Sequence, residues 1–328
     1  FIMFLVTGGA GFIGSNVVAA LNDAGRSDVA VCDVLGHDGK WRNLAKRQLA
    51  DLVPPAELGD WIKGRRLDAV IHLGAISETT ATDGDLVIET NFRLSMRLLD
   101  WCTANGTPFI YASSAATYGD GEQGFADDGS VEALKQLRPM NLYGWSKNLF
   151  DLAVAERVAK GERLPPQWAG LKFFNVFGPN EYHKGPMMSV LARRFDDIRA
   201  GRVVQLFKSH RDGIADGDQR RDFIYVDDVV RVIMWLLATP SVSGLFNVGT
   251  GKARSFKDLI VSAYGALGRE PNIEYVDMPE QIRGSYQYFT QSEVDRLRQA
   301  GYNGGFTTLE DAVRTYVGDY LDRPDRFR

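Results

Sequence analysis

The sequence predicts an α/β fold, in which a doubly wound parallel sheet is joined by a smaller, discontinuous region toward the C-terminal end. Three observations support this prediction. Residues 1–6 form a short, wholly apolar run, which is typical of a strand covered on both faces. A glycine-rich turn then leads into residues 15–24, whose helical pattern ends at Gly25. A second buried strand, Val29–Cys32, follows and ends in Asp33, which completes a strand–turn–helix–strand unit.

The turn at residues 7–14 predicts a dinucleotide-binding site. Gly8, Gly11 and Gly14 follow a Gly-x-x-Gly-x-x-Gly spacing. The first glycine permits the tight turn, the second lets the backbone approach a pyrophosphate, and the third lets the helix pack on the strand. Free N–H groups and the helix dipole at this end favour phosphates. An ordinary tight turn would also explain a glycine triplet, but the flanking strands and helix favour the dinucleotide site.

Composition limits the class of protein. The chain has 328 residues, 45% hydrophobic and 24% charged, which suits one large soluble domain or two unequal ones. A formal net charge of −4 argues against nucleic-acid binding. No apolar run approaches the roughly 18–20 residues that span a bilayer, and the apolar start is too short for a signal peptide. Cys32 and Cys102 lie in apolar stretches without metal-ligand spacing, so we expect buried thiols, no metal site and a cytoplasmic location.

Periodicity places the remaining elements. The expected helices are residues 44–63 (with a break near Pro54), 86–103, 143–160, 187–200, 227–237, 255–267, 290–300 and 308–320. The expected strands are residues 67–75, 108–112, 171–176, 222–226, 246–248 and 273–276. Residues 322–328 are expected to be a frayed tail.

Several side chains are expected at the carboxyl ends of these strands, where an open parallel sheet binds its ligand. Asp33 would face the adenosine ribose hydroxyls, which favours NAD. Lys40 would instead reach a ribose 2′-phosphate, which favours NADP, or it is simply a solvated surface lysine. Gly74 would let the cofactor lie close to the backbone, and Asn91 would bond backbone nearby. His72, inside an apolar run, is most simply a core histidine.

Three residues further along the chain suggest acid/base chemistry. Ser114 lies in a cluster of hydroxyl residues just past the strand at 108–112, although a hydroxyl-capped turn would give the same pattern. Tyr143 and Lys147 are four residues apart, so they project from one helical face. A free tyrosine has a pKa of about 10, but a lysine ammonium and an oxidised nicotinamide nearby would favour the phenolate. Ser114 would then bond the substrate oxygen that loses its proton.

These residues resemble the extended short-chain dehydrogenase/reductase superfamily, which has a Rossmann sheet, and in particular its nucleotide-sugar epimerases and dehydratases. Longer segments resemble the family of ADP-L-glycero-D-manno-heptose 6-epimerases. They are residues 111–119 (YASSAATYG), 172–179 (KFFNVFGP) with His183-Lys184-Gly185, 221–226 (RDFIYV), 246–251 (FNVGTG) and 286–291 (YQYFTQ). The chain departs from the family at Val34, where asparagine is common. Binding of a 2′-phosphate would therefore depend more on Lys40.

The resemblance implies epimerisation at C6 of ADP-D-glycero-β-D-manno-heptose by transient oxidation with bound NADP, for lipopolysaccharide core biosynthesis, with NAD as the alternative cofactor. Tyr143 would be one acid/base and Lys184 the other, because a ketone that presents both faces is served by two proton donors. Lys147 would tune Tyr143 and hold the ribose. The resemblance also implies a homo-oligomer, with a pentamer as the suggested form.

The predicted site residues fall into two groups. Those expected to bind the cofactor are Gly8, Gly11, Phe12, Ile13, Gly14, Asp33, Val34, Lys40, Leu73, Gly74, Ala75, Ile76, Ser77, Asn91, Tyr143, Lys147, Val176 and Lys184. Those expected to bind the substrate are Ser114, Asn175, Pro186, Arg193 and Tyr286, together with Phe207, Lys208, Ser209 and Arg221, whose role is implied by the resemblance. Residues 1–174, joined by 221–248 and the C-terminal helices, would form the cofactor-binding core. Residues 175–220 and 249–290 would form the substrate-binding cap.

Two alternatives remain open from the sequence. One is another nucleotide-sugar enzyme, such as a UDP-sugar 4-epimerase or a 4,6-dehydratase. A dehydratase normally has an Asp-Glu pair after the hydroxyl residue, where this chain has Ala115 and Ala116. The other is a redox-sensing protein that binds NADP without catalysis, but such proteins usually lose the Tyr-Lys pair.

Overall fold

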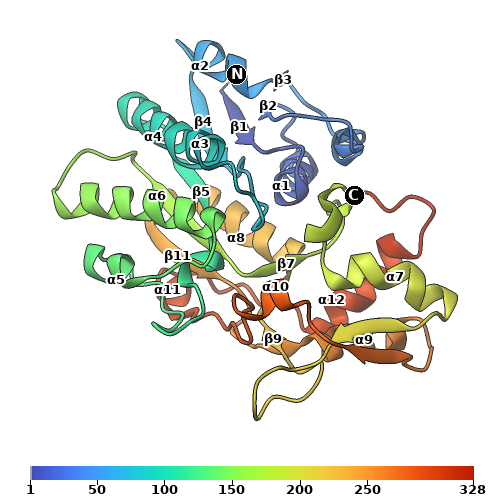
Figure 1. Cartoon of the computed structure of the whole chain (residues 1–328). Coiled ribbons are helices and arrows are strands. Elements are labelled where there is room, and N and C mark those ends of the chain that lie inside the picture. The colour runs from blue at the N-terminus through green and yellow to red at the C-terminus, as the bar shows by residue number, and fades with distance from the viewer. Residues whose placement is uncertain (1) are drawn as a thin grey trace.

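The computed structural model describes residues 2–328, and Phe1, where the first predicted strand begins, lies outside them. Within the described chain the main sheet has seven parallel strands in the order β11-β6-β5-β4-β1-β2-β3 (Figure 1). Its strands are β1 (Met3–Thr7), β2 (Val29–Cys32), β3 (Asp51–Val53), β4 (Leu67–His72), β5 (Phe109–Ser114), β6 (Trp168–Phe173) and β11 (Gly244–Val248). The predicted doubly wound parallel sheet is therefore confirmed. Its order reverses between β1 and β4, which opens a crevice at their carboxyl ends.

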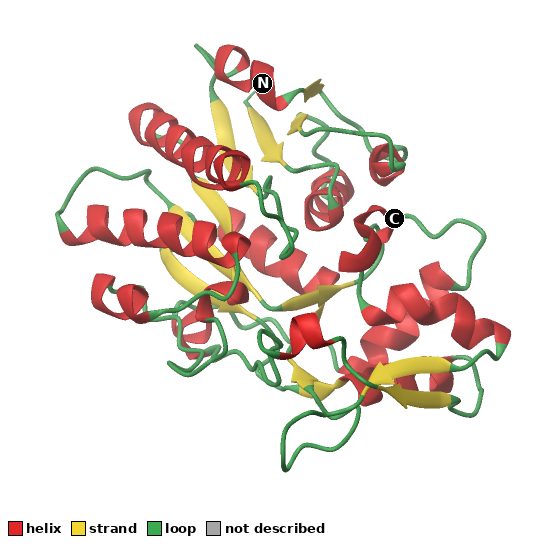
Figure 2. Ribbon diagram, viewed as in Figure 1, coloured by secondary structure: helices red, strands yellow, loops and turns green. Residues whose placement is uncertain are grey.

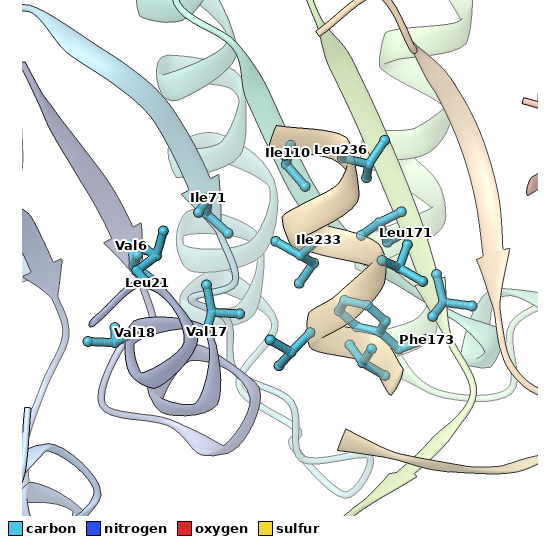
Figure 3. Packing of buried hydrophobic residues seen from close by; sticks show 14 of the residues in the cluster. Val6, Val17, Val18, Leu21, Ile71, Ile110, Leu171, Phe173, Ile233 and Leu236 are labelled. Carbon is cyan, nitrogen blue, oxygen red and sulfur yellow. The ribbon is translucent and has the colours of Figure 1, made fainter. Parts of the chain in front are cut away.

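Helices cover both faces of this sheet (Figure 2). One face packs against α1 (Phe12–Asp23) and α8 (Val226–Ala238), and the other against α4 (Leu94–Asn105) and α6 (Leu142–Ala159). Successive side chains of β1 point to opposite faces of the sheet, and both faces are apolar. Val6 packs with α1 and α8, and Leu5 packs with α4 and α6. Figure 3 shows the α1/α8 side, where apolar side chains from the sheet and from both helices meet.

A second apolar cluster, whose elements form the smaller layer of the molecule, lies beside the sheet at its carboxyl edge. It gathers side chains from α7 (Val190–Ala200), α9 (Phe256–Ala266) and α12 (Leu309–Tyr316). Three pairs of short strands lie around this cluster. They are β7 (Asn175–Phe177) with β10 (Phe223–Tyr225), β8 (Val204–Phe207) with β13 (Ile273–Val276), and β9 (Arg220–Arg221) with β12 (Arg254–Ser255). An isolated bridge also joins Arg220 to Phe289. Ser255 caps α9 through a reciprocal box with Asp258, as its position before the predicted helix suggested.

The remaining helical segments are short. They are α2 (Leu58–Trp61), α3 (Gly84–Ile88), α5 (Val131–Gln136), α10 (Glu280–Arg283), α11 (Asp295–Gln299), the 3₁₀ turns Lys40–Leu44, Pro55–Glu57, Ala115–Tyr118 and η5 (Tyr182–Met187), and the π-helical turns Glu89–Arg93 and Val317–Leu321. Among residues 2–328, none of the helices is both long and apolar enough to cross a membrane.

The helix predicted at residues 44–63 is wrong before Pro54, whereas the predicted break near Pro54 is confirmed. After Leu44, which ends a 3₁₀ turn, this stretch contains the edge strand β3, the 3₁₀ turn Pro55–Glu57 and the short helix α2. Pro54 and Pro55 prevent a continuous helix, because proline lacks the N–H that a helix interior needs. Residues just before them pair with β2, where Ala50 N donates to Val29 O at 2.8 Å. Tertiary pairing therefore overrides the helical periodicity of this segment.

The predicted helix at residues 290–300 is shorter than expected. Only Asp295–Gln299 is helical, because the polar residues before it bond to Asp222 instead. The Asp222 carboxylate accepts from Ser292 N at 2.9 Å and from Ser292 Oγ at 2.6 Å, and it also accepts from Thr250 N at 2.8 Å. Asp222 thus joins three segments that are distant in sequence.

The predicted frayed tail at residues 322–328 is also wrong, because the tail docks on the body of the molecule. Tyr182 Oη donates to Arg326 O at 2.8 Å, and the Tyr182 and Phe327 rings meet edge to face at 5.2 Å. The Arg328 guanidinium donates to Asn16 Oδ1 at 3.3 Å on α1 and to Asp227 Oδ1 at 2.8 Å on α8. The tail therefore links the turn η5 to helices of the sheet domain.

Candidate functional site

A cavity of about 690 Å³ opens at the carboxyl ends of β1, β4 and β5. The glycine turn and α6 form one side of it, and η5, α7 and segments of the smaller layer form the other. Most of the predicted site residues line it, namely Gly8, Gly11, Phe12, Ile13, Gly14, Asp33, Lys40, Leu73, Gly74, Ala75, Ser77, Ser114, Tyr143, Lys147, Asn175, Val176, Lys184, Pro186, Arg193, Phe207, Arg221 and Tyr286. The fold therefore brings together residues that are up to about 280 positions apart in the sequence.

Five of the predicted residues do not line the cavity, namely Val34, Ile76, Asn91, Lys208 and Ser209. Val34 is exposed, Lys208 lies 3.7 Å from Asp277 in an exposed pair, and Ser209 is in the same outer loop. Contact of these three with a ligand stays a prediction. Asn91 is buried and acts on backbone, as expected: its side chain accepts from Ile76 N at 2.8 Å and donates to Ile76 O at 3.0 Å.

The glycine turn has the close packing that its spacing predicts. Gly8 has a φ of +67°, and a Cβ there would lie 2.6 Å from Gly74 N. A Cβ on Gly14 would lie 2.1 Å from Gly8 O. The backbone N–H groups of Phe12, Ile13 and Gly14 have no hydrogen-bond acceptor within residues 2–328. Three unused donors at the N-terminus of a 12-residue helix, facing the cavity, fit the pyrophosphate of a dinucleotide.

Replacing Gly8 by alanine is expected to abolish dinucleotide retention. The added methyl group would overlap Gly74, and alanine is also strained at this positive φ. Cofactor content measured by absorbance after purification, together with the shift in Tm on adding dinucleotide, would check this. The control is Gly59→Ala, on an exposed helical turn where a Cβ meets nothing within 4 Å. Normal cofactor content in Gly8→Ala would contradict the assignment of this turn.

The acid at the end of β2 is held by two neighbouring groups. Asp33 Oδ2 accepts from Ala10 N in the glycine turn at 2.9 Å, and Asp33 Oδ1 accepts from Lys40 Nζ at 2.7 Å. The Lys40 side chain is only 20% exposed, so the interpretation as a solvated surface lysine is wrong. His183, from the opposite wall, lines the same cavity, and burial followed by the charge of Lys40 lowers its pKa to about 4.

Ser114, Tyr143 and Lys147 meet at the end of β5. Lys147 Nζ donates to Ala112 O at 2.9 Å and lies 5.9 Å from the centre of the Tyr143 ring. Burial lowers the pKa of Lys147 to about 8, which the charge of Asp151 partly opposes. Burial also raises the pKa of the Tyr143 phenol, while a hydrogen bond with Ser114 lowers it. The protein alone therefore does not produce the lowered tyrosine pKa that the sequence suggested.

A buried ion pair supports this cluster, and sequence reasoning missed it. Lys172 Nζ lies 3.0 Å from Asp151 Oδ2, and both residues are at most 2% exposed. Lys172 Nζ also donates to Thr117 Oγ1 at 2.5 Å, and Ser113 Oγ donates to Asp151 at 2.5 Å. The signals were present in the sequence, because Asp151 follows Lys147 by four residues on one helix and Lys172 interrupts an apolar strand.

His72 is a core histidine, as its apolar surroundings suggested. Its ring nitrogens pair with Thr7 Oγ1 at 2.6 Å and with Ser95 Oγ at 2.8 Å. Burial, and then the charge of Lys147, lowers its pKa to about 3. Both cysteines are buried free thiols, as predicted. The described residues contain no group of three or more His, Cys, Asp or Glu side chains arranged to hold a metal ion.

The cationic side chains on the opposite wall include Lys184, Arg193 and Arg221. Lys184 Nζ lies 5.3 Å from the centre of the Phe12 ring, and burial lowers the pKa of Lys184. Arg221 is buried, with its guanidinium over the rings of Phe256 at 5.4 Å and Tyr286 at 5.2 Å. Arg193 lines the cavity from the first turn of α7. Two guanidinium groups together with aromatic faces suit a ligand with phosphate groups and a planar ring.

Known proteins resemble this chain over nearly its whole length. A relative from Nitratidesulfovibrio vulgaris (strain DP4), named ADP-L-glycero-D-manno-heptose-6-epimerase, is 50% identical over 99% of this chain and 100% of its own length. One of the same name from Fusobacterium nucleatum is 42% identical, with 99% and 100% covered. The solved Helicobacter pylori ADP-L-glycero-D-manno-heptose-6-epimerase superposes with a TM-score of 0.79 at 27% identity, covering 97% of this chain and 96% of that one.

A second solved structure, a Thermus thermophilus UDP-glucose 4-epimerase in complex with NAD, has a TM-score of 0.74 at 26% identity and covers 96% of this chain and 98% of that one. A family model described as "NAD dependent epimerase/dehydratase family" matches residues 4–249, which include the glycine turn, Ser114, Tyr143, Lys147 and Lys184. The chain belongs to the NAD dependent epimerase/dehydratase family.

Proposed function

We propose that this protein inverts C6 of ADP-D-glycero-β-D-manno-heptose to give ADP-L-glycero-β-D-manno-heptose, a step of lipopolysaccharide core biosynthesis. The observation that carries the proposal is the cavity itself. Ser114, Tyr143 and Lys147 enter it from the sheet domain beside the dinucleotide turn, and Lys184 enters from the opposite wall. The names of the full-length relatives supply the substrate.

Inversion of a carbon that carries a hydroxyl group requires its configuration to be lost and regained. A nicotinamide dinucleotide held by the glycine turn would supply the redox chemistry, as acceptor of a hydride from C6 and then as its donor to the opposite face of the resulting ketone. Tyr143 moves the hydroxyl proton on one side of the sugar and Lys184 on the other, while Ser114 orients the oxygen. The Lys147 ammonium lies 5.9 Å from the centre of the Tyr143 ring, where its positive charge would favour the Tyr143 phenolate.

The residues of the sheet domain fit this cofactor. The free N–H groups of Phe12, Ile13 and Gly14 would bind the pyrophosphate, and Asp33 the adenosine ribose. Leu73, Gly74, Ala75, Ile76, Ser77 and Val176 would surround the remainder of the dinucleotide. We propose NADP rather than NAD, because Lys40 lies beside Asp33 and supplies a positive charge for a 2′-phosphate.

Replacing Lys40 by methionine is expected to weaken NADP binding by about 10- to 100-fold, the effect of one lost charged hydrogen bond. NAD binding should change little, since NAD has no 2′-phosphate. Titration calorimetry of the cofactor-free protein with each dinucleotide would measure both affinities. Lys46→Met, which removes a more exposed lysine paired with Asp325, is the control. Equal losses for NAD and NADP in Lys40→Met would contradict the NADP assignment.

The smaller layer would bind the nucleotide sugar. Arg193 and Arg221 would face the diphosphate, Phe207 and Tyr286 the adenine end, and Asn175 and Pro186 the sugar. Residues 175–220 and 249–290 would therefore act as the substrate-binding cap of a core formed by residues 1–174. We further propose a homo-oligomer, with a pentamer as the suggested form, in the cytoplasm.

The first experiment is NMR of the purified protein with ADP-D-glycero-β-D-manno-heptose, following the configuration at C6 without added cofactor. We expect the L-glycero epimer to appear, since cofactor carried through purification is recycled within each turnover. No conversion, even with NADP supplied, would exclude the heptose substrate. UDP-sugars would then test 4-epimerisation, and stabilisation by cofactor without turnover of any sugar would favour a redox-sensing protein.

A further inference from the structure

The turn that carries Lys184 is anchored by one buried carboxylate. Glu181, which precedes η5, is only 1% exposed. Its carboxylate accepts hydrogen bonds from the backbone N–H of Gly178 at 3.0 Å, from Ser189 Oγ at 3.0 Å and from Tyr316 Oη at 3.0 Å, and also from the backbone N–H of Ser189. These donors come from the end of β7, the N-cap of α7 and helix α12. Glu181 therefore joins three elements around the turn.

The same residue fixes the backbone of Lys184. Lys184 N donates to Glu181 O at 3.1 Å, so the turn closes directly on Glu181. The side chain of Lys184 points to α1, with Nζ 5.3 Å from the Phe12 ring centre. Displacement of Glu181 would therefore move Lys184 relative to the dinucleotide turn that it faces.

Glu181 also acts on Lys184 through its charge. Burial raises the pKa of the Glu181 carboxyl, while the hydrogen bonds from Gly178 and Ser189 lower it. Four hydrogen-bond donors, with no acceptor among residues 2–328, suit the ionised form. Its charge raises the pKa of Lys184 against the larger effect of burial, although no ion pair joins the two side chains within residues 2–328. The other titratable groups that face this pair are Arg193 on α7, Tyr182 and His183 on η5, and Tyr316 on α12.

We propose that Glu181 is the positioning residue for Lys184: its carboxylate fixes the turn against α7 and α12, and its negative charge keeps the Lys184 ammonium available as a proton donor. This proposal rests on the proposed acid/base role of Lys184. A direct ion pair would raise the pKa of Lys184 further and would occupy its N–H groups. The Glu181 carboxylate already accepts four hydrogen bonds, so its negative charge acts on Lys184 without a direct bond to the Lys184 amine. The amine therefore remains free to face the substrate.

The test is the variant Glu181→Gln, which keeps the shape of the side chain and removes its charge. Competitive acetylation of the holoenzyme at a series of pH values, followed by peptide mass spectrometry, reports the titration of Lys184 without any turnover. We expect Lys184 to titrate at lower pH in Glu181→Gln, because the ammonium loses a stabilising negative charge. We also expect kcat for epimerisation to fall by about 10- to 100-fold, as for a slightly misplaced catalytic group.

The matched variant is Ser189→Ala, which removes one of the donors to Glu181 but leaves its charge. Lys184 should then titrate as in the wild-type protein. An unchanged Lys184 titration in Glu181→Gln, or an equal shift in Ser189→Ala, would overturn the proposal. Because acetylation needs no substrate, this result stands apart from any failure of the heptose assay. If Glu181→Gln does not fold, Glu181→Asp replaces it: we expect a lower kcat with normal cofactor content, and wild-type kcat would overturn the proposal.

Discussion

Replacing Tyr143 by phenylalanine is expected to lower kcat for C6 epimerisation by about 10²- to 10⁴-fold, the usual contribution of a positioned acid/base. The substitution removes only the hydroxyl that Ser114 contacts, and leaves the ring beside Lys147. The amount of L-glycero epimer formed per unit time, followed by NMR, measures the loss. Cofactor content should stay normal, since the glycine turn is untouched.

The control for this result is Tyr264→Phe. Tyr264 is also a buried tyrosine with a bonded hydroxyl, but it lies in the smaller layer, where it donates to Asn272 O at 3.0 Å. Its loss should leave kcat within a few-fold of wild type. Lys184→Met should lower kcat to a similar extent as Tyr143→Phe, because both proton donors are needed for inversion. Full activity in Lys184→Met would reject the two-base mechanism, and full activity in Tyr143→Phe would reject the site.

Replacing Asp151 by asparagine is expected to lower the free energy of unfolding by about 3–5 kcal/mol, the usual effect of breaking a buried ion pair. The substitution leaves two buried lysines, Lys147 and Lys172, without their shared anion. Urea unfolding monitored by tryptophan fluorescence measures the change. A lower pKa of Lys147 should accompany it, since the charge of Asp151 raises that pKa.

Two further variants test whether the expected loss of stability arises because the ion pair is buried. Asp60→Asn, which breaks an exposed pair with Lys63, should leave stability unchanged. The double variant Asp151→Asn/Lys172→Met should lose less stability than the sum of its single variants, because the second substitution removes a charge that the first leaves unpaired. Additive losses in the double variant, or an Asp151→Asn protein as stable as wild type, would show that the Asp151–Lys172 ion pair does not stabilise the fold.

Local chemistry in the sequence was sufficient to predict the centre of the site. The strand–turn–helix unit around Gly8 is fixed by backbone sterics over a few residues, and Tyr143 and Lys147 share a helical face through spacing alone. Such features need no knowledge of the rest of the chain. The Rossmann sheet could be predicted for the same reason, since a short apolar run marks each of its central strands.

The predictions from sequence fail where contacts with residues distant in the sequence determine the local structure. Edge strand β3 forms because β2 offers unpaired backbone groups, and residues 290–294 are not helical because Asp222 binds Ser292. The pair Asp151–Lys172 is visible as two charges in apolar surroundings, but nothing in either segment identifies the other as its partner. Periodicity describes one segment at a time, whereas these contacts are made between segments.

The docked tail has a consequence for how ligands enter and leave. Its last residues contact η5, which carries Lys184, and also α1 and α8, which belong to the sheet domain. A hinge that opened the two walls of the cavity as rigid bodies would have to release these contacts together. We therefore expect the walls to stay at a fixed separation while surface loops admit the nucleotide sugar. A half-converted sugar would then remain confined between its two proton donors until inversion is complete.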